Sequence, residues 1–205
     1  MSARERRSPR SIGVWHCLQY GRDDDEASVC VHRPKRIVHL GRGENALTHV
    51  RMAGRFVALR DHYDSGAPDP CYALSVSVFD VTKRPEPSEP FDEPRGLLLP
   101  GFDESRFNCS GRPEDEHYNL PTSIVLKGNG AVAYVRCFSS DFAFGGPYRC
   151  ALNMPRQVIK HDARARRNTI TILDSGLDIA TQSLRLNGGT LTWRHGQRRR
   201  TARLR

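Results

Sequence analysis

The chain has 205 residues, of which 38% are hydrophobic, and its eight Phe, six Tyr and two Trp can fill a core. This composition excludes a wholly disordered protein. The apolar runs are far shorter than the roughly 20 residues of a transmembrane helix, so we expect no membrane span. The formal net charge is +9, and it resides at the two ends of the chain.

Both ends of the sequence are basic, whereas the body is neutral. Residues 1–12 contain four Arg and one Glu, and residues 194–205 contain six Arg and no acid. We predict that residues 1–12 form a disordered basic arm and that residues 13–205 form a single domain. The N-terminus lacks the apolar segment of a signal peptide, which favours the cytoplasm for the chain as it begins.

Three short strands are predicted in the first part of the chain from alternating apolar residues: Val14–Leu18, Val29–His32 and Arg36–Leu40. The sequence GRGENA at residues 41–46 echoes a dinucleotide-binding turn, but a strand pattern follows it instead of the required helix. We therefore predict a plain turn there. The acidic run Asp23–Glu26 lacks the ligand spacing of a calcium loop and is interpreted as a solvated hairpin tip.

Three hairpins of similar sequence follow at Val50–Leu59, Ile124–Tyr134 and Leu184–Trp193. Each has alternating apolar residues, a turn that contains Gly, and a second apolar strand, and the middle turn is one residue longer. Further strands are predicted after these hairpins at Leu74–Phe79, Gln157–Lys160, Thr169–Leu173 and Arg200–Leu204. Single helical turns are the most that residues 163–168 and 176–182 could form. The pattern predicts an all-β protein.

Two segments interrupt the hairpins. We interpret Asp61–Asp69 as an acidic loop and Arg84–Pro121, rich in Pro, Asp and Glu, as a long insertion over one end of the sheets. Leu97–Leu99 within it could anchor the insertion or add a short edge strand.

The repeated hairpin, followed by a strand that ends in VFDVTK at residues 78–83, resembles the blades of WD40-like and TolB-like β-propellers. The C-terminal stretch LDSGLDIATQSLRLNGGTLTWRHGQRRRTARL is similar to that of a group of uncharacterised, usually secreted proteins from GC-rich bacteria. The resemblance covers about residues 36–205. It implies antiparallel meanders in a β-propeller-like arrangement that three hairpins leave incomplete, and binding instead of catalysis. A β-sandwich is the alternative fold.

The six cysteines form two pairs with matching spacing. Twelve residues separate Cys17 from Cys30, and twelve separate Cys137 from Cys150, each pair flanking a polar loop. Facing strands of a hairpin would bring such pairs within bridging distance, and each bridge would contribute about 3 kcal/mol. Cys71 and Cys109 would then form the third pair. The alternative to these bridges is six reduced thiols. Disulfides and the resemblance favour a secreted protein, whereas the missing signal segment favours the cytoplasm.

Metal and catalytic motifs are weak. The chain offers His16, Cys17, Cys30 and His32 as zinc donors, but adjacent strand residues point to opposite faces, which leaves only Cys17, Cys30 and His32 together. We therefore expect no metal and no other cofactor. No G-x-S-x-G elbow or other catalytic set is present. An enzyme site in the long loops, built for example from Asp115, Glu116 and His117, is the second alternative for function.

The C-terminal arginines Arg194, Arg198, Arg199 and Arg200 are candidates for binding a polyanion. Protection of a sheet edge against aggregation is an alternative use of such charges, and a GC-rich coding bias is another. The leading hypothesis is a non-catalytic binding module for a protein or small molecule, with loops 61–72 and 84–121 as its binding surface. The alternative is a polyanion- or nucleic-acid-binding protein that uses both basic ends.

Overall fold

A computed structural model describes residues 14–15, 26–31, 36–42, 49–64, 72–82, 97–99, 118–139, 150–163 and 170–205. All strand pairs in these ranges are antiparallel, and the ranges contain no α-helix, so the predicted all-β class is confirmed. None of the described residues forms a helix long and apolar enough to cross a membrane. The predicted N-terminal arm, residues 1–12, lies outside these ranges.

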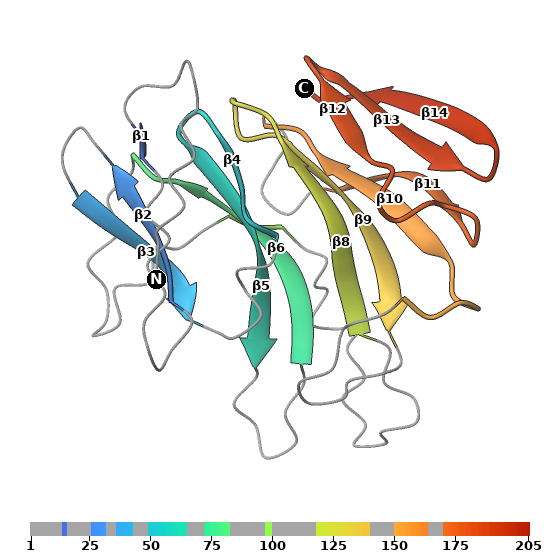
Figure 1. Ribbon diagram of the computed structural model, residues 1–205, viewed down its shortest axis with the longest axis horizontal. Helices are drawn as coiled ribbons and strands as arrows, with labels where there is room; N and C mark the ends of the chain where they lie inside the picture. The colour runs from blue at the N-terminus through green and yellow to red at the C-terminus, as the bar shows by residue number, and fades with distance from the viewer. Residues whose placement is uncertain are drawn as a thin grey trace, which may run out of the picture.

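The strands form four open sheets that follow one another across the molecule (Figure 1). Within each sheet every strand pairs antiparallel with its neighbour in sequence, which is the pattern of a β-meander. The first sheet contains β1 (Val14–Trp15), β2 (Glu26–Val31) and β3 (Arg36–Arg42), and the second contains β4 (Arg51–Ala53), β5 (Phe56–Asp64), β6 (Tyr72–Asp80) and β7 (Leu97–Leu99). The third sheet contains β8 (Tyr118–Leu126), β9 (Val132–Ser139), β10 (Arg156–His161) and β11 (Thr171–Gly176). The fourth sheet contains β12 (Arg185–Asn187), β13 (Thr190–His195) and β14 (Arg198–Arg203).

The three predicted hairpins are confirmed as β4–β5, β8–β9 and β12–β13, which occupy the same place in the second, third and fourth sheets. Their turns contain Gly54, Gly130 and Gly188, with φ of 61°, 90° and 59°. L-residues with a Cβ rarely adopt this left-handed backbone, so the glycines permit the tight turns. The turns of neighbouring sheets also touch, since a Cβ on Gly54 would lie 3.3 Å from the carbonyl oxygen of Gly128.

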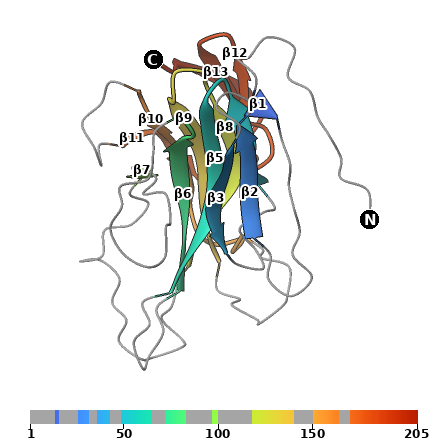
Figure 2. The same cartoon turned by 90° about the vertical axis from the view of Figure 1, so that its left-hand side faces the viewer.

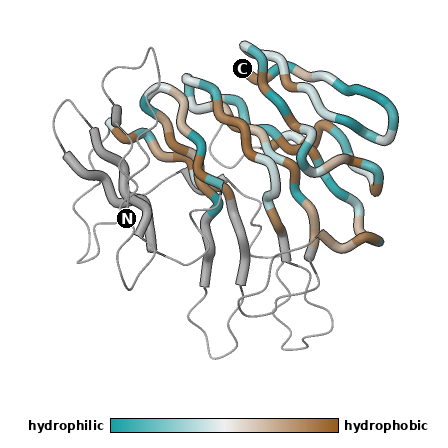
Figure 3. The backbone as a smooth tube through the Cα atoms, viewed as in Figure 1, coloured by the Kyte–Doolittle hydropathy of each residue, from teal (hydrophilic) through white to brown (hydrophobic). Residues whose placement is uncertain are grey.

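Strand β9 is buried on both faces, which places the third sheet between the second and the fourth. One set of its alternating side chains packs with the fourth sheet in a cluster of Ala131, Ala133, Val135, Val158, Ile179, Leu184, Leu191, Trp193 and Leu204. The other set packs with the second sheet in a cluster of Ala58, Val76, Val78, Ile124, Val132, Tyr134 and Ile159. Figure 2 shows the layered sheets from the side, and in Figure 3 the hydrophobic colours follow these middle strands. Each fully buried Val or Leu contributes roughly 1.5–3 kcal/mol.

Side chains also bond the sheets to one another through backbone carbonyls. Arg51 Nε in the second sheet donates to the carbonyl of Ile124 in the third at 3.1 Å. Lys127 Nζ, in the turn of the third sheet, donates to the carbonyl of Leu204 beyond β14 at 3.0 Å. Each of these bonds satisfies a carbonyl that the sheet ladders leave unpaired, as buried polar groups require. The layers are therefore joined by directional bonds as well as by apolar contact.

Some element boundaries differ from the prediction. β5 extends to Asp64, so the first residues of the expected loop Asp61–Asp69 belong to a strand. β8 begins at Tyr118 and contains Pro121, where the register shifts, so the expected insertion Arg84–Pro121 ends earlier. Pro is tolerated there because β8 pairs only with β9, as an edge strand. The short edge strand at Leu97–Leu99 is confirmed as β7, paired with β6. Gly176 ends β11, and residues 177–182 form turns with one isolated bridge, from Ile179 to His195, and no helical turn.

Candidate functional site

The fourth sheet is built by two tight turns. Gly188 and Gly189 join β12 to β13, and Gly196 and Gln197 join β13 to β14. Gly196 has φ of 56°, which suits a two-residue hairpin turn. Because this turn is so short, β14 begins at Arg198, two residues before the predicted strand. The whole run Arg198–Arg200 therefore lies in the strand.

The register assigns the side chains of the fourth sheet to two faces, since directly opposite residues share a face. Leu191 and Trp193 are buried against the third sheet and define the inner face. Arg194 lies opposite Arg199, and the alternation of strand residues puts both on the outer face. The outer face thus looks away from the third sheet.

The outer face of the fourth sheet is polar and basic. It consists of Arg185, Asn187, Thr190, Thr192, Arg194, Arg199, Thr201 and Arg203. Its four arginines are exposed. No acidic residue occurs between residues 183 and 205, whereas seven arginines do. In Figure 3 the hairpin of β13 and β14 is largely hydrophilic.

The structure divides the predicted polyanion-binding set between the two faces. Arg194 and Arg199 belong to the outer face, whereas Arg198 and Arg200 lie opposite His195 and Trp193 and share the inner face. Arg185 and Arg203 join the outer face, although sequence analysis did not select them. Alternation within β12 would have found Arg185, because its neighbours Leu184 and Leu186 are apolar and adjacent strand residues point to opposite faces.

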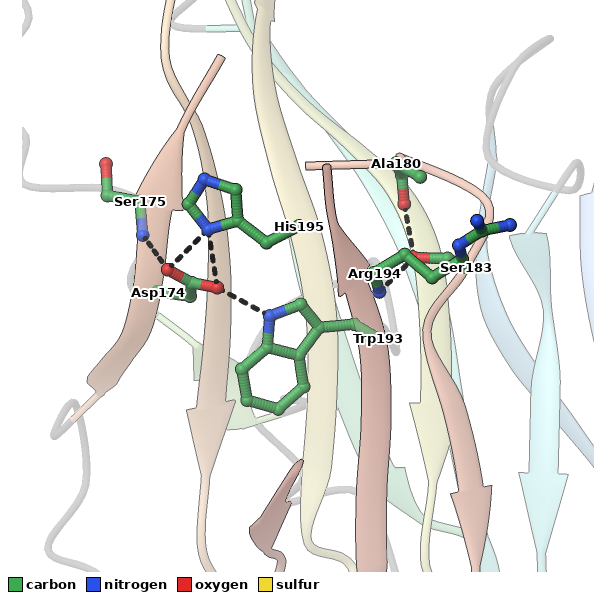
Figure 4. A network of polar contacts seen from close by, with 7 residues as sticks. All are labelled: Asp174, Ser175, Ala180, Ser183, Trp193, Arg194 and His195. Carbon is green, nitrogen blue, oxygen red and sulfur yellow. Dashed lines mark hydrogen bonds and ion pairs between the residues drawn. The ribbon is translucent and has the colours of Figure 1, made fainter. Parts of the chain in front are cut away.

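A network around Asp174 holds the fourth sheet to β11 of the third (Figure 4). Trp193 Nε1 donates to Asp174 Oδ2 at 2.7 Å, and His195 Nδ1 lies 3.0 Å from the same oxygen. The amide of Ser175 donates to Oδ1 at 3.0 Å. Charge-assisted bonds to a partly buried carboxylate are among the stronger hydrogen bonds in proteins. Asp174 therefore anchors the back of the basic face.

A second bridge supports the same sheet. Ser183 Oγ donates to the carbonyl of Ala180 at 2.7 Å and accepts the amide of Arg194 at 2.9 Å (Figure 4). The backbone of Arg194 is thus held from outside the strand ladder. Ser183 thus supports the position of Arg194 in the sheet in addition to the strand pairing.

The pairing of Asp174 with His195 resembles part of a catalytic triad, but both side chains lie where they join β13 to β11. A Cβ built on Gly176 would lie 2.7 Å from His195 Nε2, so the imidazole lies directly against the backbone of β11. No hydroxyl or thiol of the described residues is hydrogen-bonded to Nε2. A triad needs a nucleophile at that nitrogen.

Asp174 should make the stability of the protein sensitive to acid. Burial raises the pKa of its carboxyl, but hydrogen bonds from Trp193 and His195 outweigh burial and hold the pKa below its ordinary value. A carboxyl with a lowered folded-state pKa stabilises the fold above its unfolded pKa, and this contribution is lost as the pH falls through the folded pKa.

We therefore expect the difference in unfolding free energy between the wild type and Asp174→Asn to be constant well above the ordinary pKa of an Asp carboxyl, about 4, and to shrink as the pH falls below it. Urea unfolding at a series of pH values measures this difference. The exposed Asp178→Asn is the matched control and should change the free energy of unfolding by no more than about 0.5 kcal/mol. A constant difference for Asp174→Asn would contradict the assigned role.

The predicted disulfide between Cys137 and Cys150 is confirmed, with Cα atoms 5.5 Å apart. Cys137 is fully buried and packs with Leu120. The other predicted pairs, Cys17–Cys30 and Cys71–Cys109, lie outside the residues whose side chains are described, as do the zinc set with His32 and the loop residues Asp115, Glu116 and His117. Within the described ranges no group of three or more His, Cys, Asp or Glu could hold a metal ion.

A shallow, open depression lies beside the turn between β13 and β14, lined by Leu152, Arg156, Leu177, Asp178, Ala180, Gly196 and Gln197. Leu152 and Leu177 expose 85% and 51% of their surface. The guanidinium of Arg156 donates to the carbonyls of Leu177 and Ile179 and so stabilises the turn that follows β11. An open surface of this kind does not enclose a small ligand.

The outer face of the fourth sheet is thus the strongest candidate site in the described part of the chain. It combines exposed charge with a backbone that side-chain hydrogen bonds support. Function has to follow from this chemistry, because no protein-family model, curated protein or solved structure matches the chain.

Proposed function

We propose that the chain is a non-catalytic binding module in which consecutive antiparallel meanders are arranged like blades of a β-propeller. Three observations support this arrangement: the third sheet packs between its neighbours, the first strands β4 and β12 both contact β8, and the hairpin turns of successive sheets touch. Successive blades of a propeller surround a common centre in this way. The resemblance of the hairpins to WD40-like and TolB-like repeats supports the same proposal.

The module binds an anionic macromolecule on the outer face of its fourth sheet. The observation that carries this proposal is the direct opposition of Arg194 and Arg199. Like charges at opposite positions destabilise a sheet, so the pair is unfavourable in the free protein. An anion placed between the two guanidinium groups would reverse that effect.

Protection against aggregation does not account for this pair. Charges that block edge-to-edge association belong on an edge strand. Arg199 is on the edge strand β14, but Arg194 is on β13, the central strand of the sheet. A charge on the central strand does not block pairing at the edge. Its position on an exposed face therefore favours ligand binding as its role.

The test is binding of fluorescently labelled polyglutamate and oligothymidylate, followed by anisotropy between about 50 mM and 200 mM salt. Affinity should fall steeply with salt. The double variant Arg194→Gln/Arg199→Gln should weaken binding by about tenfold or more, since each charge-assisted bond contributes about 1.5–3 kcal/mol.

The matched control is Arg198→Gln/Arg200→Gln, which removes the same charge from the other face of the same hairpin. It should weaken binding less. Equal losses for the two double variants, or an affinity that does not depend on salt, would count against the outer face as the site.

A further inference from the structure

The fourth sheet has one strand fewer than its two predecessors. The second and third sheets each contain four strands, whereas the fourth contains three. Its last strand, β14, pairs with β13 along one edge, and no described strand pairs with the other edge. Figure 1 shows β14 at the margin of the molecule. An unpaired edge is a template for a further strand.

Hydrogen bonds identify which backbone groups of β14 face this open edge. The amide of Leu204 donates to the carbonyl of Gly189, so alternate residues back from Leu204 face β13. The N–H and C=O groups of Arg199, Thr201 and Arg203 then face outward. Lys160 Nζ donates to the carbonyl of Arg203 at 3.1 Å, which agrees with this assignment. Arg199 and Thr201 are left with donors and acceptors that an incoming strand can pair.

Charge determines which kind of strand fits. β14 contains four arginines in six residues, RRRTAR. A second copy of β14 would oppose arginine with arginine, which is destabilising. An incoming strand with carboxylates at alternate positions would instead put them on the outer face beside Arg199 and Arg203. Opposite charges at facing positions stabilise strand pairs.

We propose that β14 accepts an extended acidic segment of a partner protein as the fourth strand of its sheet. Backbone bonds to Arg199 and Thr201 supply the pairing, and carboxylates beside Arg199 and Arg203 supply the selectivity, as in other cases of strand addition. This inference rests on the proposed function, because it uses arginines of the same outer face.

The test separates backbone pairing from charge. The probe is a labelled peptide of alternating Glu and Thr, compared with an analogue that is N-methylated on alternate residues and has the same charge. The protein variants are Thr201→Pro, which removes an outward N–H, and Thr201→Val, which keeps it. Because that N–H faces away from β13, proline there costs no bond of the sheet.

We expect N-methylation and Thr201→Pro each to weaken peptide binding by about fivefold or more, the effect of losing roughly one hydrogen bond. Thr201→Val should bind as the wild type does. Thermal unfolding checks that both variants fold. If Thr201→Pro does not fold, the comparison of the two peptides on the wild-type protein decides alone.

The remaining outcomes distinguish the two proposals. If both peptides bind equally and Thr201→Pro has no effect, strand addition is wrong while anion binding stands. Tighter binding of oligothymidylate that is insensitive to Thr201→Pro would identify a nucleic acid as the partner and overturn the acidic strand. If no anionic probe binds, both proposals are wrong.

Discussion

Replacing Trp193 with alanine is expected to lower the free energy of unfolding by about 3–5 kcal/mol, the largest effect of any single substitution proposed here. Trp193 is 3% exposed and lies in the cluster that joins the third and fourth sheets. The substitution opens a cavity there. It also removes the indole donor from Asp174, a bond of 2.7 Å.

Urea unfolding followed by circular dichroism measures this loss. Thr192→Ala, on the outer face of the same strand, is the matched control and should change stability by only about 0.5 kcal/mol. Trp193→Phe should fall between them, because it keeps most of the apolar volume but not the donor. If Trp193→Ala lost less than about 1 kcal/mol, the packing of the fourth sheet against the third would be wrong.

Removing the disulfide between Cys137 and Cys150 is expected to cost about 3 kcal/mol, because the bridge restricts the unfolded chain. The bridge joins residues separated by 13 positions in the sequence. Cys137 is itself fully buried, so the double variant Cys137→Ala/Cys150→Ala keeps a small apolar side chain in the core. Alanine here tests the cross-link without adding a buried polar group.

Unfolding of the oxidised wild type and the double variant under identical conditions measures this contribution. Alkylation of the unreduced protein followed by peptide mass spectrometry provides the direct check. Peptides that contain Cys137 and Cys150 should be found linked. Finding both cysteines alkylated before reduction would contradict the bridge.

The hairpins were predictable because their signals are local. Alternation of apolar residues and a glycine at each turn identify β4–β5, β8–β9 and β12–β13 without knowledge of distant contacts. The Cys137–Cys150 bridge is also local, because its cysteines are only 13 positions apart. Cys137 lies in β9, and Cys150, which lies in no strand, is held beside it by the bond from the amide of Ala151 to the carbonyl of Phe138. Local pattern is enough where the partner is a neighbour in sequence.

The composition of the basic face was harder to predict, because it depends on the length of one turn. The sequence pattern predicts the last strand only from Arg200, and the two-residue turn at Gly196 and Gln197 adds Arg198 and Arg199 to β14. A turn longer or shorter by one residue would shift the register of β14 against β13 and exchange the faces of its four arginines. Register is set by cross-strand pairing, which no isolated run of arginines encodes.

The role of Asp174 was not foreseeable from sequence for a different reason. The carboxylate meets Trp193 and His195, which are 19 and 21 positions away and belong to another sheet. A single acid in a strand carries no pattern that names its partners. Contacts between sheets depend on how the layers stack, and this is fixed only when the core clusters form.

The polar outer face of the fourth sheet limits where a further sheet could pack. Both faces of the third sheet are apolar and pack against neighbouring sheets. A sheet packed on the outer face of the fourth sheet would instead have to remove water from four guanidinium groups. Burying an unpaired charge is prohibitive, so a duplicated meander could not simply be appended against this side. The fourth sheet thus has the polar outer face that capping repeats need, and packing a further apolar sheet on it would first require exchanging its arginines for apolar residues.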